Sequence, residues 1–96
     1  MAVEVSSGNP YIDYPLMNGD KLRVFSEETH ASEYVWHRDR QDRIVYVEEC
    51  GDLWFFQEDN KKPFELKKGD RIRVEKMIYH RLIKGDGRLV LRIKEV

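Results

Sequence analysis

The residues whose types and spacing point most directly to chemistry are His37, Asp39 and His80. Imidazole and carboxylate groups are side chains with which proteins bind divalent metal ions. His37 and Asp39 are two positions apart, so on a β-strand both side chains point to the same face of the sheet. His80 lies on a distant segment, and it can meet the other two only if the sheets curl to face each other. A barrel gives that arrangement.

The segments that must position these residues have the pattern of short β-strands. After residue 20, apolar and polar residues alternate with a period of two, and turn residues interrupt the alternation about every 8–12 residues. The predicted strands are 21–25, 33–39, 43–47, 53–57, 64–66, 71–75, 79–83 and 88–96. We expect 53–57 to return from 43–47 as a hairpin, and Leu89, Leu91 and Ile93 to share a buried face of the last strand. The pattern is typical of an all-β sandwich or barrel.

The first 20 residues differ from the rest, because turn-forming Gly, Asn, Pro and Asp break the alternation several times. Tyr11, Ile12, Tyr14 and Leu16 are nevertheless apolar enough to pack against a neighbour. We therefore expect an ordered N-terminal arm over residues 1–20, packed on the barrel or on a partner subunit. The barrel domain is expected over residues 21–96.

Length and composition narrow the class of protein further. With 96 residues, the chain is expected to form one domain. Its 17 Lys and Arg against 18 Asp and Glu give a net charge of −1, so we expect neither nucleic acid nor a membrane as a partner. The single cysteine, Cys50, cannot form an intramolecular disulfide. No signal-peptide pattern and no apolar run of roughly 20 residues is visible, which predicts a cytoplasmic protein.

The segment from about residue 31 to residue 84 resembles the cupin family. The first motif of that family runs Gly, five residues, His-x-His, three or four residues, Glu, six residues, Gly. Laid on this sequence, it places its two His on His37 and Asp39, its Glu on Arg43 and its closing Gly on Cys50. The spacing is kept without a gap, whereas the set of metal ligands is altered.

The second cupin motif runs Gly, five residues, Pro-x-Gly, two residues, His. Here it starts on Gly69 and ends on His80, and its Pro-x-Gly falls on Glu75-Lys76-Met77. The resemblance implies the fold of the family, an all-β double-stranded β-helix, or jelly-roll barrel. That fold agrees with the alternating pattern of the strands.

In cupins the motif residues surround a divalent metal such as iron, manganese, nickel or zinc inside the barrel. The resemblance therefore implies that His37, Asp39 and His80 hold such a metal, and two imidazoles with one carboxylate suit Fe(II) and related ions. Arg43 stands where the family has Glu, and a guanidinium cannot bind a metal. We expect Arg43 to bind a carboxylate or phosphate of the substrate, or to pair with Asp39.

Three functions fit these residues. The first is a metal-dependent enzyme that acts on a small polar or anionic molecule by oxygenase, isomerase or lyase chemistry. The second is a metal-free cupin that binds a small ligand with Arg43 as its anchor. The third is a structural, oligomeric protein whose site is vestigial. We expect small-molecule binding at the centre of the barrel, with the divalent metal and catalysis left open.

A homodimer is also expected. Consecutive Trp54, Phe55 and Phe56 put apolar groups on both faces of a strand. In so small a protein one of these faces can bury against a second copy of the chain, as in many cupins.

Overall fold

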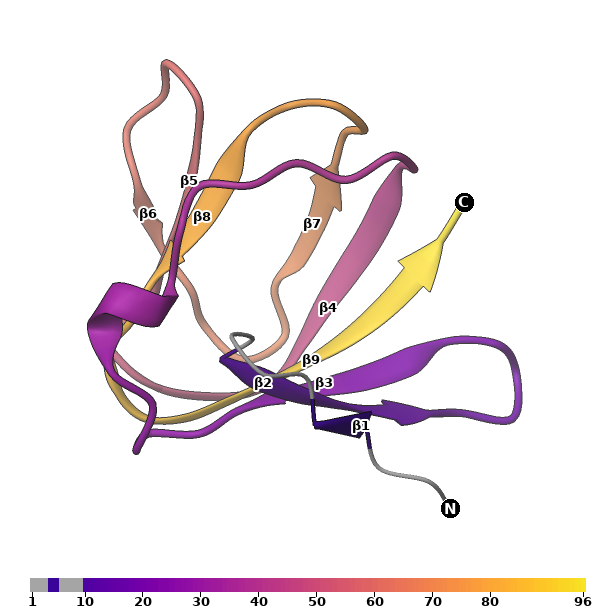
Figure 1. The fold of residues 1–96 in the computed structure, drawn as a ribbon, viewed down its shortest axis with the longest axis horizontal. Coiled ribbons are helices and arrows are strands. Elements are labelled where there is room, and N and C mark those ends of the chain that lie inside the picture. The colour runs from indigo at the N-terminus through magenta and orange to yellow at the C-terminus, as the bar shows by residue number, and fades with distance from the viewer. Residues whose placement is uncertain (1–3, 6–9) are drawn as a thin grey trace.

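The computed structural model describes residues 4–5 and 10–96, and in these residues the chain is built almost entirely of β-strands (Figure 1). The strands are β1 (Glu4–Val5), β2 (Tyr11–Pro15), β3 (Lys21–Phe25), β4 (Arg43–Asp52), β5 (Phe55–Glu58), β6 (Phe64–Glu65), β7 (Arg71–Val74), β8 (His80–Ile83) and β9 (Asp86–Glu95). A 3-10 turn, η1, covers Ala31–Glu33. The prediction of an all-β fold is confirmed. Within the described residues, no helix is long and apolar enough to cross a membrane.

The strands form two antiparallel sheets that face each other. The larger sheet has the order β1-β2-β3-β9-β4-β7, and the smaller has the order β6-β5-β8. In Figure 1, β5, β6 and β8 lie opposite β3, β9 and β4, and connections such as those between β4 and β5 and between β7 and β8 join the two sheets. His80 is on β8 in the smaller sheet, and Arg43 is on β4 in the larger. Residues from both sheets can therefore meet between them.

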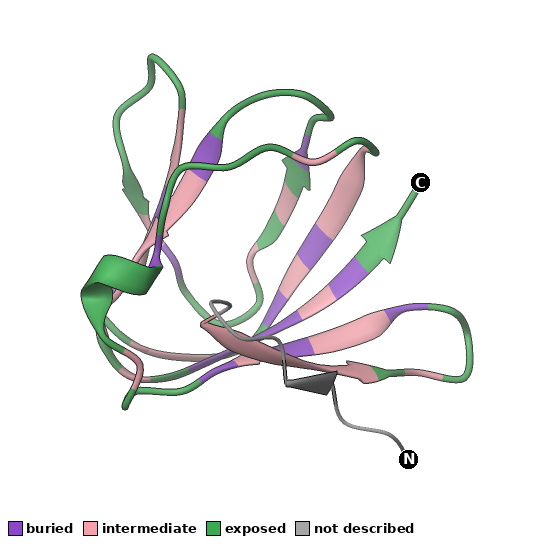
Figure 2. Cartoon of the chain, viewed as in Figure 1, coloured by how far each residue is buried: buried purple, intermediate pink, exposed green. Residues whose placement is uncertain are grey.

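The core lies between the sheets and is centred on β9. This strand pairs with β3 on one side and β4 on the other, and it contributes Leu89, Leu91 and Ile93 as buried side chains, as predicted. Figure 2 shows the buried stretches of β3, β4, β8 and β9 in purple. Trp54 is fully buried at the start of the smaller sheet, and its indole Nε1 donates a hydrogen bond to the carbonyl of Asp86 at 3.2 Å.

The segment predicted as a strand over residues 33–39 is not one, and this prediction is wrong. His37 forms a single bridge with His80, in which each backbone N–H donates to the carbonyl of the other residue at 3.0 and 2.8 Å. Beyond that bridge, the carbonyl of Asp39 accepts from the backbone N–H of Met77 at 2.7 Å. Met77 has a φ of 64°, which turns the chain away before a second ladder bond can form.

The segment after β4 was expected to return beside it as a hairpin, and this prediction is also wrong. β5 pairs with β6 and β8, whereas β4 pairs with β7 and β9. Register shifts bend β4 near Cys50, and Leu53 has a φ of 63°, so the chain leaves the larger sheet there. Gly51 permits the bend, since a Cβ at this position would overlap the carbonyl oxygen of Asp86.

β2 lies within the N-terminal segment and pairs with β3 from Tyr11↔Phe25 to Pro15↔Lys21. β1 pairs with β2 in turn, and residues 1–3 and 6–9 of the expected arm lie outside the described residues. The division into an arm over 1–20 and a barrel over 21–96 stays a prediction.

Candidate metal and ligand site

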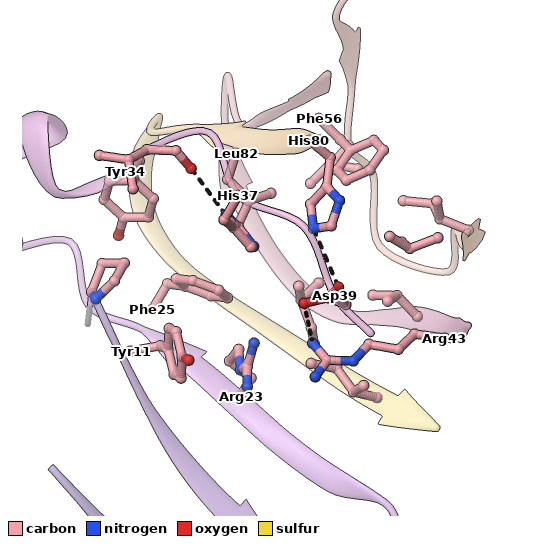
Figure 3. A pocket seen from close by; sticks show the side chains of 18 of the residues that line it. Tyr11, Arg23, Phe25, Tyr34, His37, Asp39, Arg43, Phe56, His80 and Leu82 are labelled. Carbon is pink, nitrogen blue, oxygen red and sulfur yellow. Dashed lines mark hydrogen bonds and ion pairs between the residues drawn. The ribbon is translucent and has the colours of Figure 1, made fainter. Parts of the chain in front are cut away.

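A cavity of about 270 Å³ lies between the two sheets (Figure 3). Most of its wall is apolar, with side chains that include Phe25, Val45, Phe56, Val74, Leu82 and Leu91. The polar groups on the wall include Arg23, Glu33, Tyr34, His37, Asp39, Arg43 and His80. An apolar cavity with a few converging polar groups is the usual form of a small-molecule site, and this volume suits a small ligand.

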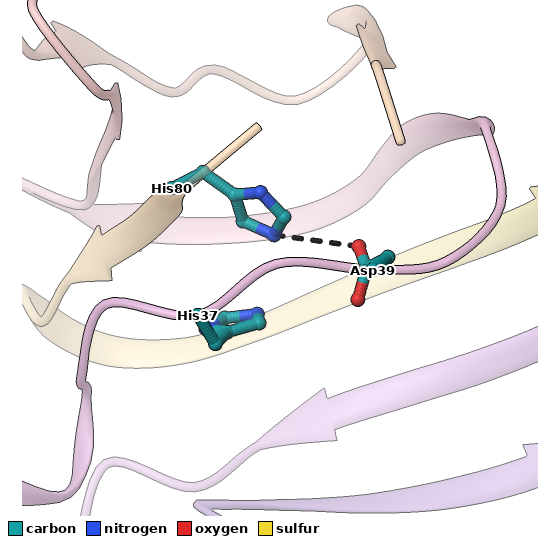
Figure 4. Close-up of side chains that lie close together, drawn as sticks. All are labelled: His37, Asp39 and His80. Atoms are coloured by element: carbon teal, nitrogen blue, oxygen red, sulfur yellow. Dashed lines mark ion pairs between the residues drawn. The ribbon is translucent and has the colours of Figure 1, made fainter. Parts of the chain in front are cut away.

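The structure brings His37, Asp39 and His80 together on this wall (Figure 4). One candidate ligand atom from each residue lies within 4.8 Å of the others. His37 and Asp39 come from the irregular segment after η1, and His80 comes from the first residue of β8. The backbone bridge between His37 and His80 holds the two imidazole rings with their centroids 4.4 Å apart. The four residues singled out in the sequence, Arg43 included, all line the cavity.

The two histidines have the same hydrogen-bond arrangement. Nδ1 of His37 lies 3.0 Å from the carbonyl of Val35, and Nδ1 of His80 lies 3.0 Å from the carbonyl of Ile78. A carbonyl only accepts hydrogen bonds, so each Nδ1 carries a proton and donates it. In the neutral rings, each Nε2 therefore presents a lone pair. This is the orientation of a histidine whose Nε2 is ready to bind a metal.

Asp39 places each of its oxygens against a different side chain. Its Oδ1 lies 3.3 Å from Nη1 of Arg43, and its Oδ2 lies 3.4 Å from Nε2 of His80. Burial lowers the pKa of His80 most, and the charge of His37 lowers it further. These two effects outweigh the carboxylate of Asp39, which raises the pKa. At neutral pH a lone pair on His80 thus faces a carboxylate oxygen, and two acceptors at this distance repel unless a cation lies between them.

Two further polar residues of the cavity wall are buried, and the sequence reasoning missed both. Arg23 on β3 is 8% exposed, and Tyr34 is 9% exposed. The hydroxyl of Tyr34 has no hydrogen-bond partner within the described residues, and burial raises the pKa of Tyr34 to about 12. The alternation on residues 21–25 puts Arg23 on the same face of the strand as Phe25. This shared face is the feature of the sequence that could have indicated the burial of Arg23. The sequence did not reveal that this face, rather than the one with Leu22 and Val24, turns inward.

The two facing sheets and the His–Asp–His group on the cavity wall define a cupin barrel, as the resemblance of the motifs predicted. Solved structures match it over nearly the whole chain. A cupin-like protein, TM1010, from Thermotoga maritima MSB8 is 24% identical over 97% of this chain and 75% of that chain, with a TM-score of 0.68. A cupin-2 domain containing protein from Shewanella frigidimarina NCIMB 400 is 18% identical over 99% of this chain and 80% of that chain, with a TM-score of 0.60.

The structure of Fe(II) HppE matches with a TM-score of 0.78 and 14% identity over 99% of this chain. This chain spans 55% of the HppE chain. At these identities the likeness shows the fold, and the chain has the cupin fold. No protein-family model and no curated protein matches the sequence.

Proposed function

We propose that the protein binds a divalent metal ion through His37, Asp39 and His80, and holds a small polar or anionic molecule beside it. The observation that carries this proposal is geometric: one candidate ligand atom from each of the three residues lies within 4.8 Å of the others, and Nε2 of His80 lies 3.4 Å from Oδ2 of Asp39. A divalent cation would turn this repulsive contact into two favourable ones. Polar atoms inside a protein normally have a partner, so two acceptors that face each other favour a cation between them.

The residues present fit such an ion. Neighbouring donor atoms at about 2.1 Å from a metal are about 3 Å apart in an octahedral site, close to the separation of these two atoms. Asp39 offers Oδ2, while Arg43 holds Oδ1 and thereby orients the carboxylate. Iron, manganese, nickel and zinc are the metals to test, and Fe(II) suits two imidazoles with one carboxylate. When bound, the ion supplies a Lewis acid for an oxygen of the ligand.

Arg43 is the residue proposed to contact the ligand beside the metal. Its side chain is 17% exposed and lines the cavity, and its Nη1 is engaged with Asp39. Its Nε is buried without a hydrogen-bond partner among the described residues. A ligand oxygen placed near Asp39 would give this nitrogen an acceptor. Apolar neighbours such as Val45 and Val74 would exclude water from the contact.

Thermal unfolding with and without added metal tests the proposal. Fe(II), Mn(II), Ni(II) and Zn(II) are added separately to metal-free protein, and an ion that prefers the folded state raises the melting temperature by several degrees. The shift is expected to vanish in His37→Ala and in His80→Ala. His30→Ala is the matched control, because His30 is exposed and does not line the cavity. An equal shift in His80→Ala and in the wild type would contradict the proposal.

A metal-free ligand-binding protein is the second candidate, and the ion pair between Asp39 and Arg43 favours it. In that function Arg43 neutralises Asp39, and the cavity binds a small molecule without any ion. The two candidates differ in their response to a chelator. Ligand binding that survives dialysis against EDTA and is lost in Arg43→Gln would support the second.

A cytoplasmic homodimer is proposed as the form in which the protein works. Exposed apolar side chains flank the bridge between His37 and His80: Val35 and Trp36 precede His37, and Ile78 and Tyr79 precede His80. Such a group of exposed apolar side chains often marks a contact between subunits. Sedimentation velocity over a range of protein concentrations tests the dimer, and a mass of one chain throughout would exclude it.

A further inference from the structure

The cavity wall next to Arg43 is apolar on the larger sheet. Arg43 of β4 pairs with Val74 of β7. Val45, two residues further along β4, pairs with Ile72 of β7 on one side and with Ile93 of β9 on the other. All of these residues line the cavity, because residues two apart on a strand share one face of the sheet. We call Val45, Ile72, Val74 and Ile93 the apolar floor, and it begins directly beside Arg43.

The smaller sheet adds apolar side chains of its own to the cavity. Phe56 of β5 pairs with Leu82 of β8, and both line the cavity. The ring of Phe56 lies 5.6 Å from the ring of His80, measured between centroids, and Figure 3 shows the two rings side by side. Apolar surface therefore reaches the candidate metal site from both sheets, at His80 on one and at Arg43 on the other.

Few hydrogen-bond donors are available to a ligand at this place. An ionised Asp39 only accepts hydrogen bonds, and the Nδ1 groups of both histidines are directed to backbone carbonyls. The guanidinium of Arg43 and a bound metal ion are left to bind an anionic group. Arg23 and Tyr34 come from β3 and from the end of η1, outside the apolar floor. A ligand hydroxyl on the floor would lose water without gaining a partner.

We propose that the ligand is a monocarboxylic acid with an apolar body, whose carboxylate lies between Arg43 and the metal ion and whose body packs on the apolar floor. The inference rests on the proposed function and narrows its ligand. A carboxylate has two oxygens, one for the ion and one for the guanidinium. A phosphate group or a sugar acid has more oxygens than this part of the cavity has partners, and buried oxygens without partners weaken binding.

A series of straight-chain acids tests the apolar body. Acetate, butyrate and hexanoate are titrated into Zn(II)-loaded protein by calorimetry, with acetate measured by competition against hexanoate. Each methylene that leaves water is expected to raise the affinity roughly three- to fourfold, so that hexanoate binds on the order of 100-fold more tightly than acetate. Equal affinities along the series would overturn the inference.

Three six-carbon analogues test the chemical class of the ligand. Hexanamide keeps the body and removes the charge, gluconate keeps the carboxylate and adds hydroxyl groups, and hexyl phosphate replaces the carboxylate. Hexanoate is expected to bind roughly tenfold more tightly than each of them, or better. Binding of hexanamide or of hexyl phosphate as tight as that of hexanoate would overturn the carboxylate. Binding of gluconate as tight as that of hexanoate would overturn the apolar body.

Ile72→Thr tests the apolar floor, because it keeps a β-branched residue on β7 and replaces apolar atoms of the wall with a hydroxyl. The variant is expected to lose several-fold in hexanoate affinity and to bind acetate as the wild type does, a difference that a general loss of folding would not produce. Ile83→Thr is the matched control, since Ile83 is also a half-buried strand residue but does not line the cavity. Equal hexanoate affinity in Ile72→Thr and in the wild type would overturn the place assigned to the body.

Zn(II) titration of the same proteins separates this inference from the proposed function. Ile72→Thr is expected to bind Zn(II) as the wild type does, because Ile72 is not part of the His–Asp–His group. Zn(II) binding without a rise in affinity from acetate to hexanoate would overturn the inference and leave the metal site standing. Hexanoate binding that rises with chain length and weakens in Ile72→Thr, in a protein that takes up no Zn(II), would overturn the metal site and keep the apolar floor as the place of the ligand.

Discussion

Asp39 contacts Arg43 through one oxygen and His80 through the other, and these two contacts have opposite effects on a metal. The imidazole beside Oδ2 adds a second ligand. The guanidinium beside Oδ1 orients the carboxylate, but its positive charge repels a cation. Arg43 stands at the position where the cupin motif has Glu, so the same substitution removes a ligand and adds a repulsive charge. The affinity of the site depends on which effect is larger.

Changing Arg43 tests this balance directly. Arg43→Gln removes the charge and keeps hydrogen-bond donors for Asp39, so we expect Zn(II) to bind roughly tenfold more tightly, about 1.4 kcal/mol. Arg43→Glu adds back a carboxylate and is expected to bind more tightly still. Calorimetric titration with Zn(II) measures both. Arg73→Gln, which changes an exposed arginine on β7, is the control for net charge. Weaker Zn(II) binding in Arg43→Gln would show that orientation of Asp39 matters more than repulsion.

Tyr34 carries a prediction about stability. Its hydroxyl is buried and unpaired among the described residues, so the ligand-free protein gains little from it. Tyr34→Phe is expected to leave the free energy of unfolding unchanged or to raise it by about 1 kcal/mol, because the desolvation penalty of the hydroxyl is removed. Urea unfolding measures this, with Tyr79→Phe at an exposed ring as the control. A clear loss of stability would mean that the hydroxyl has a partner in the folded protein.

At the scale of elements, the alternation of the sequence predicted most strands but not their partners. Residues 21–25 and 71–75 coincide closely with β3 and β7, because a period of two survives wherever one face is buried. Residues 33–39 alternate equally well and yet form one bridge, since the turn at Met77 removes the neighbouring strand. Which strands pair depends on such local bends, and alternation carries no information about them.

The turn at Met77 leads to a prediction about the free energy of unfolding. It occupies the position of the Gly in the Pro-x-Gly of the second cupin motif, and its φ of 64° lies in the left-handed region that favours glycine. Its side chain is 47% exposed, so little packing is lost on its removal. Met77→Gly is expected to raise the free energy of unfolding by about 0.5–1 kcal/mol, measured by urea unfolding. Lys76→Gly, at a residue without positive φ, is expected to lower it.

In the whole molecule, the candidate site lies between the two sheets and takes residues from both. Arg43 comes from the larger sheet, His80 from the smaller, and Asp39 from the segment between η1 and β4. A metal bound at this place links parts of the chain that meet only in the folded barrel. Binding is therefore expected to stabilise the whole fold rather than one element, and this is why thermal unfolding reports on it.

The candidate site could be predicted from the sequence only in part. His37, Asp39 and His80 have side-chain types and spacings that fit the cupin motifs, and these are properties of the sequence alone. Arg23 and Tyr34 belong to no motif, and their place in the cavity depends on which face of β3 turns inward and on the path of the chain after η1. Those features are set by packing between the sheets.

The metal content of the purified protein shows whether His37, Asp39 and His80 bind an ion. Protein is prepared without chelator or affinity tag, reconstituted separately with Fe(II), Mn(II), Ni(II) and Zn(II), desalted and analysed by mass spectrometry of the elements. We expect close to one ion per chain in the wild type and in His30→Ala, and almost none in His80→Ala. An absence of bound metal in the wild type, or equal metal in His80→Ala, would contradict this expectation.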